Sequence, residues 1–326
     1  MLKTISKWLA IVTVALLLAP GSAAAAEVVL YSSNPSELLD MVSKGFEVKT
    51  KIKVSVVRMG TGEAMKRIAA EKNRPLADVF WSGDVAVLEN AKENFQGYRS
   101  HEAKGLPAGY VEQEGRWTAS NAHVMIIMVN KAQVKESEMP KTWQELFNPK
   151  WKGKIVMANP EKSGSAYAQV YGIYKLYGWD GLKQLIANAK VLDSSSLIYK
   201  GVAAGEYPLG ITMEYAAHRY IVGGDKNVGI VYPSDGAFVA PEAAGIIKNC
   251  PHPEEAKKFV DYLLSKPVVD EIFAKFSRRP ARSDAGDAEG LPAIKAIPIL
   301  KSFDPIEANR LEKELLKKWK EIMLSR

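Results

Sequence analysis

The stretch EVVLYSSNPSELLDMVSKGFEVKTKIKVSVVRMGTG, residues 27–62, decides the fold. Its first residues form a short β-branched run that ends in small polar residues at Ser32 and Ser33. Apolar residues then recur at helical spacing up to Phe46, and a second β-branched run, 51–58, ends in a glycine-containing turn. The sequence therefore predicts strand, helix and strand. The same pattern begins again at residues 77–84, and such alternation is typical of a mainly parallel sheet with helices on both faces.

A second series of strands and helices follows a long apolar run at residues 123–131, and it is expected to begin with a helix that contains Trp143. We expect this run to be a strand that passes between two domains. A return strand is predicted at 244–247, followed by helical sequence and by an amphipathic helix at 305–324. Two α/β domains joined by two extended crossings predict a cleft that opens and closes about a hinge. The expected division is a first lobe at 27–127 plus 240–277, and a second lobe at 128–239 plus 278–326, which includes the C-terminal helix.

The first 26 residues have the features of a secretory signal peptide. Lys3 and Lys7 give a basic start, an apolar run follows to residue 20, and small residues precede Glu27, where we expect the mature chain to begin. This apolar run is too short for a good membrane span, and no later stretch approaches about 18 consecutive apolar residues. The sequence predicts an exported protein in the periplasm.

Composition limits the possible chemistry. The single cysteine, Cys250, cannot form an internal disulfide and is too little for a zinc or iron–sulfur cluster. The 326 residues carry a formal charge of +7, with 44 basic and 37 acidic side chains. A basic excess suits the capture of small anions, although an ordinary basic surface is the better explanation when charge is taken alone.

No motif indicates catalysis or a cofactor. The four histidines are scattered, the turn at 60–62 lacks the third glycine of a dinucleotide fingerprint, and Gly164 is not followed by the lysine of a phosphate-binding loop. The segment SGSAYA, 163–168, is not a hydrolase elbow. We therefore expect no cofactor, no resident metal and no nucleic-acid partner. An exported enzyme that uses an unrecognised set of residues remains the alternative of a different class.

Three polar segments follow predicted strands and precede predicted helices. They are Ser32-Ser33, Thr61-Gly62 and Ser163-Gly164-Ser165. Backbone amides at helix N-termini, together with nearby hydroxyls, can hold a phosphate without any lysine. Each segment alone is more often an ordinary cap or turn. Their occurrence at equivalent strand ends in both predicted domains favours an anion site.

Further polar residues end other predicted strands. Ser195 belongs to the run 193–196, for which an N-cap and a ligand contact are equally good interpretations. Ser82 follows the third strand, and Glu214-Tyr215 lies where a strand changes into a helix. Ligands of such sheets bind where the carboxyl ends of strands meet, so these residues are also candidates.

Long segments of the chain resemble the periplasmic solute-binding proteins of ABC importers. The similarity is to the branch that contains ferric-ion-binding proteins and relatives that bind sugar phosphates or 2-aminoethylphosphonate. This resemblance implies an α/β fold of the two-lobed, Venus-flytrap type. The segments that carry it are VVLYSS (28–33), PLADVFWSGD (75–84), NPKWKGKIVMANPEKSGSAYA (148–168), GEYPLGITMEYAAHRY (205–220) and GIVYPSDGAFVAPEAAGIIKNCPHPEEAKKFVDYLLS (229–265).

The resemblance also bears on the ligand. Ferric-binding relatives usually hold iron through adjacent tyrosines, but here Tyr215 is followed by Ala216. The segment 163–165 matches the one that holds a synergistic anion in those relatives. The resemblance thus implies an organic phosphate or phosphonate, with Glu214 bound to sugar hydroxyls or to an ammonium. Ferric capture through Tyr215 with a supplied anion is the alternative.

These considerations lead to one prediction of function. We expect a non-catalytic periplasmic protein that closes its lobes over a small phosphorylated anion and presents it, as a monomer, to an inner-membrane ABC permease. The expected ligand-binding residues are Ser33, Thr61, Ser82, Ser163, Gly164, Ser165, Ser195, Glu214 and Tyr215.

Overall fold

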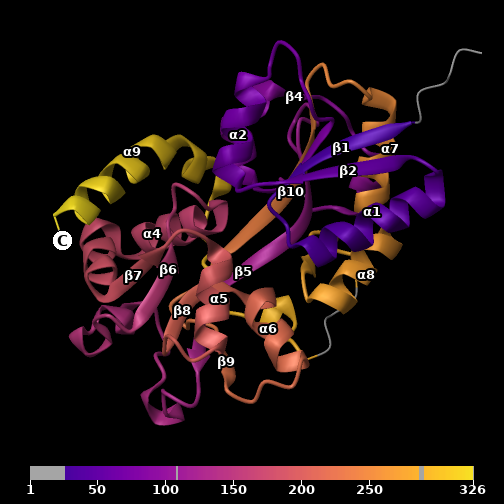
Figure 1. Ribbon diagram of the computed structural model, residues 1–326. Helices are drawn as coiled ribbons and strands as arrows, with labels where there is room; N and C mark the ends of the chain where they lie inside the picture. Colours follow the sequence, from indigo (N-terminus) through magenta and orange to yellow (C-terminus); the bar gives the residue numbers. More distant parts are fainter. Residues whose placement is uncertain (1–25, 108, 286–289, 326) are drawn as a thin grey trace, which may run out of the picture.

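The computed structural model describes residues 26–107, 109–285 and 290–325 (Figure 1). Two α/β lobes lie on either side of two strands, β5 (Thr118–Asn130) and β10 (Val239–Ile247). The expected signal peptide lies outside the described residues, apart from Ala26. None of the helices within these ranges is long and apolar enough to span a bilayer.

Lobe 1 contains the strands predicted from residues 27–84. Strand β1 pairs in parallel with β2 and β3, and Ser32 is level with both Arg58 and Trp81, so the carboxyl ends of the three strands lie together. The strands of lobe 1 are β1 (Glu27–Ser32), β2 (Lys53–Arg58), β3 (Val79–Asp84) and β4 (Phe95–Gln96). Its helices are α1 (Ser36–Thr50), α2 (Thr61–Ala70), α3 (Val85–Asn90), α7 (Pro253–Leu264) and α8 (Lys266–Phe276), with short 3-10 helices at Lys92–Asn94 and His101–Gly105.

Lobe 2 repeats this arrangement after β5. Strand β6 pairs in parallel with β7 and β8, whereas β5 runs antiparallel to β8 and β9. The strands are β6 (Ile155–Ala158), β7 (Ala189–Leu192), β8 (Leu209–Met213) and β9 (Val228–Val231). The helices are α4 (Gly164–Asn188), α5 (Ser195–Ala203), α6 (Glu214–Val222) and α9 (Pro305–Leu324), with 3-10 helices at Glu136–Glu138, Gln144–Phe147, Pro149–Trp151 and Ile294–Ala296. The helix expected around Trp143 is therefore only a 3-10 helix of four residues, Gln144–Phe147.

Each lobe has its own apolar core. In lobe 1, Phe46 of α1 packs edge-on against Phe259 of α7, with ring centroids 5.2 Å apart. In lobe 2, Trp143 stacks on Phe238 at 4.9 Å. Burial of such aromatic side chains contributes much of the stability of a domain of this size. The two cores leave the polar strand ends between them.

Three segments connect the lobes at the hinge. Strand β5 pairs with β10 up to Val124 and with β8 from Met125 onward, so one strand belongs to both sheets. A third segment follows α8, where the short strand β11 (Arg279–Pro280) pairs with β5. The structure thus adds a connection to the two crossings expected from the sequence.

The lobes approach each other closely beside the cleft. A side chain at Gly62 of lobe 1 would begin 3.0 Å from the backbone carbonyl of Glu161 in lobe 2. On the α9 side, the Asn309 side chain donates a 2.9 Å hydrogen bond to the carbonyl of Ala86. Helix α9 therefore packs on α4 (Figure 1) and also contacts α3 of lobe 1.

Candidate functional site

A cavity of about 530 Å³ lies between the lobes. Both lobes and the hinge contribute to its wall, and nine of the lining residues carry hydroxyl groups on serine or threonine. These nine are Ser33, Ser36, Thr61, Ser82, Ser163, Ser165, Ser194, Ser195 and Ser196. A wall so rich in hydroxyls is suited to a polar ligand.

The lobe 1 side of the cavity is a cluster of hydroxyls at the ends of β1, β2 and β3. Ser33 Oγ lies 3.1 Å from Thr61 Oγ1 and 2.8 Å from Ser82 Oγ. Ser82 has a positive φ of 103°, which is strained for a residue with a side chain. Strain of this kind persists only where the surroundings enforce it, and it concentrates at functional sites.

The lobe 2 side is a triangle of serines. Ser163 Oγ lies 2.6 Å from Ser195 Oγ and 3.0 Å from Ser165 Oγ, and the third side, between Ser165 and Ser195, measures 2.9 Å. Ser163 is the N-cap of α4, and Ser195 is the first residue of α5. The serine triangle (Ser163, Ser165 and Ser195) therefore joins the N-termini of two helices.

Helix N-termini converge on the cavity from both lobes. The first residues of α1, α2, α4 and α5 line it, as does Tyr215, the second residue of α6. In α1, α2, α5 and α6 the N-cap side chain makes no capping hydrogen bond. Free amide donors and the positive ends of the helix dipoles both favour an anion here.

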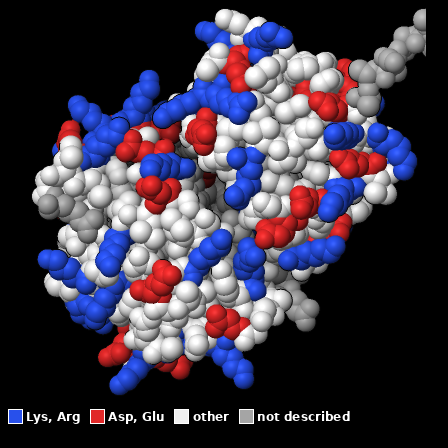
Figure 2. Space-filling model, viewed as in Figure 1, with Lys and Arg blue, Asp and Glu red and all other residues white. Residues whose placement is uncertain are grey.

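Basic side chains surround the entrance. Arg58 of lobe 1 and Lys162, Lys200 and Arg219 of lobe 2 are exposed residues of the cavity wall. Figure 2 shows lysine and arginine on both sides of a hollow in the middle of the face. Such a field attracts small anions and increases their local concentration.

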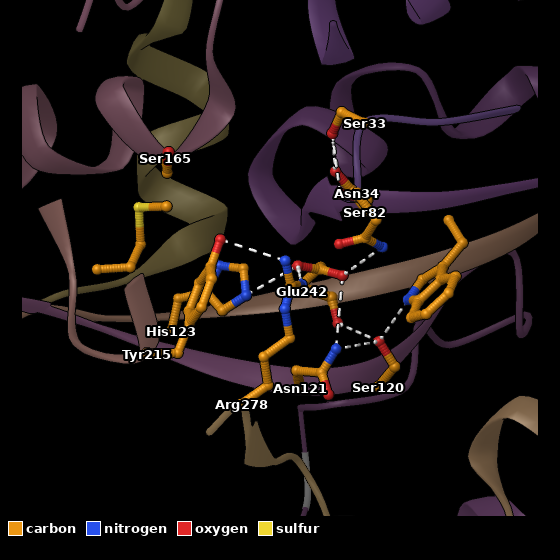
Figure 3. Close-up of polar contacts among 12 residues, drawn as sticks. Ser33, Asn34, Ser82, Ser120, Asn121, His123, Ser165, Tyr215, Glu242 and Arg278 are labelled. Carbon is orange, nitrogen blue, oxygen red and sulfur yellow. Dashed lines mark hydrogen bonds and ion pairs between the residues drawn. The ribbon is translucent and has the colours of Figure 1, made fainter. Parts of the chain in front are cut away.

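The floor of the cavity is a buried polar network on the hinge (Figure 3). Glu242 of β10 accepts a 2.8 Å hydrogen bond from Arg278 Nη1, and its Oε2 lies 2.8 Å from His123 Nε2. The Asn34 and Asn121 side chains approach its other oxygen at 3.4 and 3.5 Å. Burial alone would raise the pKa of Glu242, but Arg278 and His123 outweigh it and hold the pKa at about 2. Glu242 is therefore a fully engaged carboxylate.

Tyr215 forms the edge of this floor. The Arg278 guanidinium lies over its ring at 4.3 Å, and Arg278 Nη2 donates to its hydroxyl at 3.2 Å. Burial raises the pKa of the phenol to about 12, although Arg278 opposes that rise. Tyr215 thus keeps its proton at neutral pH and can donate it in a hydrogen bond.

Glu214 does not lie in the cavity, contrary to the expected ligand contact. Its side chain is 1 % exposed and accepts two hydrogen bonds from Arg279, at 2.6 and 2.9 Å. The Tyr232 hydroxyl donates a third, at 2.6 Å. Because Glu214 and Tyr215 begin a helix, their side chains point in different directions, and only Tyr215 faces the cleft. The other eight predicted residues all line the cavity.

Asp84 is an additional acidic residue of the wall. Its carboxylate accepts a 2.9 Å hydrogen bond from the Ala86 amide and caps α3. Burial raises the pKa of Asp84 to about 7, and Glu312 and Glu242 add to the rise. Part of its charge is consequently lost near neutral pH, which reduces its repulsion of a bound anion.

The charged residues of the floor were not among those predicted from the sequence. Arg278, Glu242 and His123 reach the cavity from three segments that are far apart in the chain. A signal was present, because Glu242 is a lone carboxylate within an apolar strand and Arg278 belongs to a consecutive pair of arginines. Charged residues in such segments need a buried partner, but the sequence does not say which one.

The metal ligands of ferric-binding relatives are only partly represented. Tyr215 lines the cavity, whereas Ala216 is fully buried and has no donor atom. Two other phenols, Tyr199 and Tyr220, also line it. Within residues 26–107, 109–285 and 290–325 there is no group of three or more His, Cys, Asp or Glu side chains that could hold a metal ion.

Comparison with known proteins shows what the chain is similar to. The profile of a family described as bacterial extracellular solute-binding protein matches residues 74–305. Iron uptake protein A1 of Synechocystis is 29 % identical over 264 residues, which cover 74 % of this chain and 72 % of that protein. A putative 2-aminoethylphosphonate-binding periplasmic protein of Salmonella typhimurium is 23 % identical, and the match covers 80 % of this chain and 79 % of that protein.

A solved structure extends the comparison. The periplasmic binding protein AfuA of Actinobacillus pleuropneumoniae, with fructose-6-phosphate bound, superposes with a TM-score of 0.85 at 25 % identity. The match covers 91 % of this chain and 98 % of that protein. The expected two-lobed fold is therefore confirmed.

Proposed function

Because this chain belongs to the bacterial extracellular solute-binding proteins, which deliver ligands to the membrane permeases of ABC importers, we propose that it captures a small phosphorylated organic anion between its lobes. One observation carries this proposal. The N-termini of α1, α2, α4, α5 and α6 meet at one cavity that is also lined by serine hydroxyls. This arrangement supplies many hydrogen-bond donors for an oxyanion.

The serine triangle is the proposed phosphate site. Its three hydroxyls now bond to one another within 3.0 Å, and they can turn to a phosphate with little movement. Gly164 between them has no side chain, so the backbone can approach the anion closely. Ser33, Thr61 and Ser82 face the triangle from lobe 1 and would contact the remainder of the ligand.

Closure of the lobes is the proposed response to ligand. A molecule that touches both walls of the cavity stabilises the closed form because it makes its full set of contacts only there. The protein would then present the ligand to an inner-membrane permease as a monomer. Its role is binding and delivery, without chemical change to the ligand. Recovery of a chemically altered ligand after long incubation would instead favour an enzyme.

A panel of ligands tests the proposal. Binding to the folded protein raises its melting temperature by mass action, so fructose-6-phosphate or a phosphonate should raise the Tm of the mature chain. A rise with ferric citrate and none with any phosphorylated compound would contradict it.

Substitution of Ser165 tests the site itself. Ser165→Glu places a negative charge within the serine triangle, and like charges at contact cost several kcal/mol, so affinity for a phosphorylated ligand should fall roughly 100-fold or more. Ser137→Glu is the matched control, because Ser137 is exposed and does not line the cavity. Unchanged affinity of Ser165→Glu in calorimetry would remove the triangle from the site.

Ferric-ion capture is the second candidate. It is supported by the three phenols that line the cavity and by the name of the Synechocystis relative. Against it, the Arg278 cation lies 4.3 Å from the Tyr215 ring and would repel a ferric ion bound at that phenol. A ferric–tyrosinate complex absorbs visible light, so an iron-loaded protein that stays colourless excludes this candidate.

A further inference from the structure

The floor of the cavity carries an arginine whose hydrogen-bonding capacity is only partly used. Arg278 is 2 % exposed, and its guanidinium has five N–H donors. Among the described residues, Glu242 accepts one of them and Tyr215 accepts another. Arg278 also belongs to the cavity wall, so the remaining donors are available to a ligand.

Tyr215 adds a further donor. Its hydroxyl accepts the bond from Arg278, which leaves its own proton free. In Figure 3, Tyr215 and Arg278 lie below and between Ser165 of lobe 2 and Ser33 of lobe 1. A ligand anchored by the serines of the two walls would therefore meet these donors with its other end.

The same floor is poorly suited to a cationic group. Glu242 is its buried carboxylate, and both of its oxygens already have partners, with Arg278 and His123 on one and amide groups on the other. The Arg278 guanidinium covers one face of the Tyr215 ring, and the His123 ring lies 5.1 Å from it, so this ring is a poor partner for an ammonium. Glu214, the other candidate partner for an ammonium, is bound to Arg279 outside the cavity.

The other acids of the wall do not change this balance. Glu37 is exposed in the first turn of α1, at the edge of the cavity. Asp84 accepts a hydrogen bond from the Ala86 amide, and burial raises its pKa to about 7. Neither provides an unpaired buried carboxylate beside Arg278.

We infer that Arg278 and Tyr215 select phosphorylated ligands whose other end carries oxygen atoms that accept hydrogen bonds, as in hydroxyl or carboxylate groups, over ligands that end in an ammonium. This inference rests on the proposed function and narrows it to phosphorylated ligands with hydroxyl or carboxylate groups at the other end, such as sugar phosphates and hydroxy-substituted phosphonates. A site that donates hydrogen bonds to an oxygen rejects an ammonium in its place, because two sets of donors then face each other without an acceptor.

Two matched pairs of ligands test the inference by calorimetry on the mature chain. They are glucose-6-phosphate with glucosamine-6-phosphate, and 2-hydroxyethylphosphonate with 2-aminoethylphosphonate. Within each pair a hydroxyl replaces an ammonium. We expect the hydroxyl compound to bind at least about tenfold more tightly in every pair that binds, and equal affinities or a preference for the amine would overturn the inference.

Substitutions in the cavity floor test whether its residues cause the preference for the hydroxyl compounds. The double variant Arg278→Gln/Glu242→Gln removes both buried charges together, so it avoids the unpaired charge that would unfold a single variant. It should reduce the preference to less than about threefold, and Tyr215→Phe should reduce it in part. Tyr98→Phe is the control, because Tyr98 bonds to Asp261 and does not line the cavity.

The possible outcomes distinguish failure of the inference from failure of the proposed function. A preference that survives intact in the double variant would overturn the role of Arg278 while the proposed function stands. If none of the four paired compounds binds, and neither fructose-6-phosphate nor inorganic phosphate binds, the proposed function is overturned and the inference with it.

Discussion

Two neighbouring arginines each neutralise a buried glutamate, but the two ion pairs differ in what surrounds them. We call Arg278–Glu242 the front pair, because it lines the cavity, and Arg279–Glu214 the back pair, because it does not. Consecutive residues in extended chain point to opposite sides, so adjacent arginines reach different environments. Glu214 and Tyr215 are also adjacent in the chain, and only Tyr215 lines the cavity.

The pairs also differ in how completely they are satisfied. Arg279 binds both oxygens of Glu214 and donates as well to the carbonyl of Pro292. Arg278 binds only one oxygen of Glu242 and keeps donors for other acceptors. A saturated ion pair serves folding, whereas one with unused donors on a cavity can serve a ligand. Substitutions in the back pair should therefore change stability, whereas those in the front pair should also change ligand binding.

The largest expected effect is on the back pair. Glu214→Gln leaves the Arg279 charge buried without a counter-ion, and loss of one partner of a buried pair costs about 3–5 kcal/mol in the free energy of unfolding. Ligand affinity of the folded protein should not change, because Glu214 lies outside the cavity. Urea denaturation and calorimetry measure the two quantities. Glu314→Gln is the control, because Glu314 is exposed. A Glu214→Gln protein that has normal stability but no longer binds ligand would refute the distinction between the front pair and the back pair.

The front pair should dominate stability in acid. The pKa of Glu242 is held at about 2, below its ordinary value of 4.5, because Arg278 and His123 outweigh the effect of burial. Its contribution to stability is thus fully present above about pH 4.5 and is lost as the pH falls towards 2. The loss amounts to about 3 kcal/mol.

Unfolding free energies measured across this pH range test that expectation. The double variant Arg278→Gln/Glu242→Gln has no carboxylate to titrate in the front pair and leaves no unpaired charge, so its profile should be flatter than that of the natural chain. Parallel profiles for the two proteins would mean that the front pair does not control acid stability.

The smallest expected effect concerns Tyr232, the phenol of the back pair. Tyr232→Phe removes one hydrogen bond from Glu214, which still keeps Arg279, so the free energy of unfolding should fall by about 1–2 kcal/mol. Affinity should be unaffected. Tyr215→Phe is the matched change on the front side and should alter ligand selectivity instead. Equal effects of the two variants on selectivity would remove the difference between the pairs.

Much of the fold could be predicted because its signals are local. Alternation of β-branched runs with helical stripes located most strands of both lobes but missed β4, β11 and the first residues of β10. The polar ends of the predicted strands supplied eight of the residues that line the cavity. Their contact with a ligand stays a prediction. The segment around Trp143 was assigned too much helix, since tertiary packing fixes that tryptophan against Phe238 while only a 3-10 helix follows it.

Local residue patterns set where strands end and helices begin, and they therefore gather hydroxyls and amide donors at one edge of each sheet. The packing of distant segments brings Arg278, Glu242 and His123 together beneath them, and it turns Tyr215 to the cavity and Glu214 to Arg279. The reason is physical. Helix starts and strand ends depend on neighbouring residues, whereas the partner of a buried charge is chosen by the pairing of segments that lie far apart in the chain.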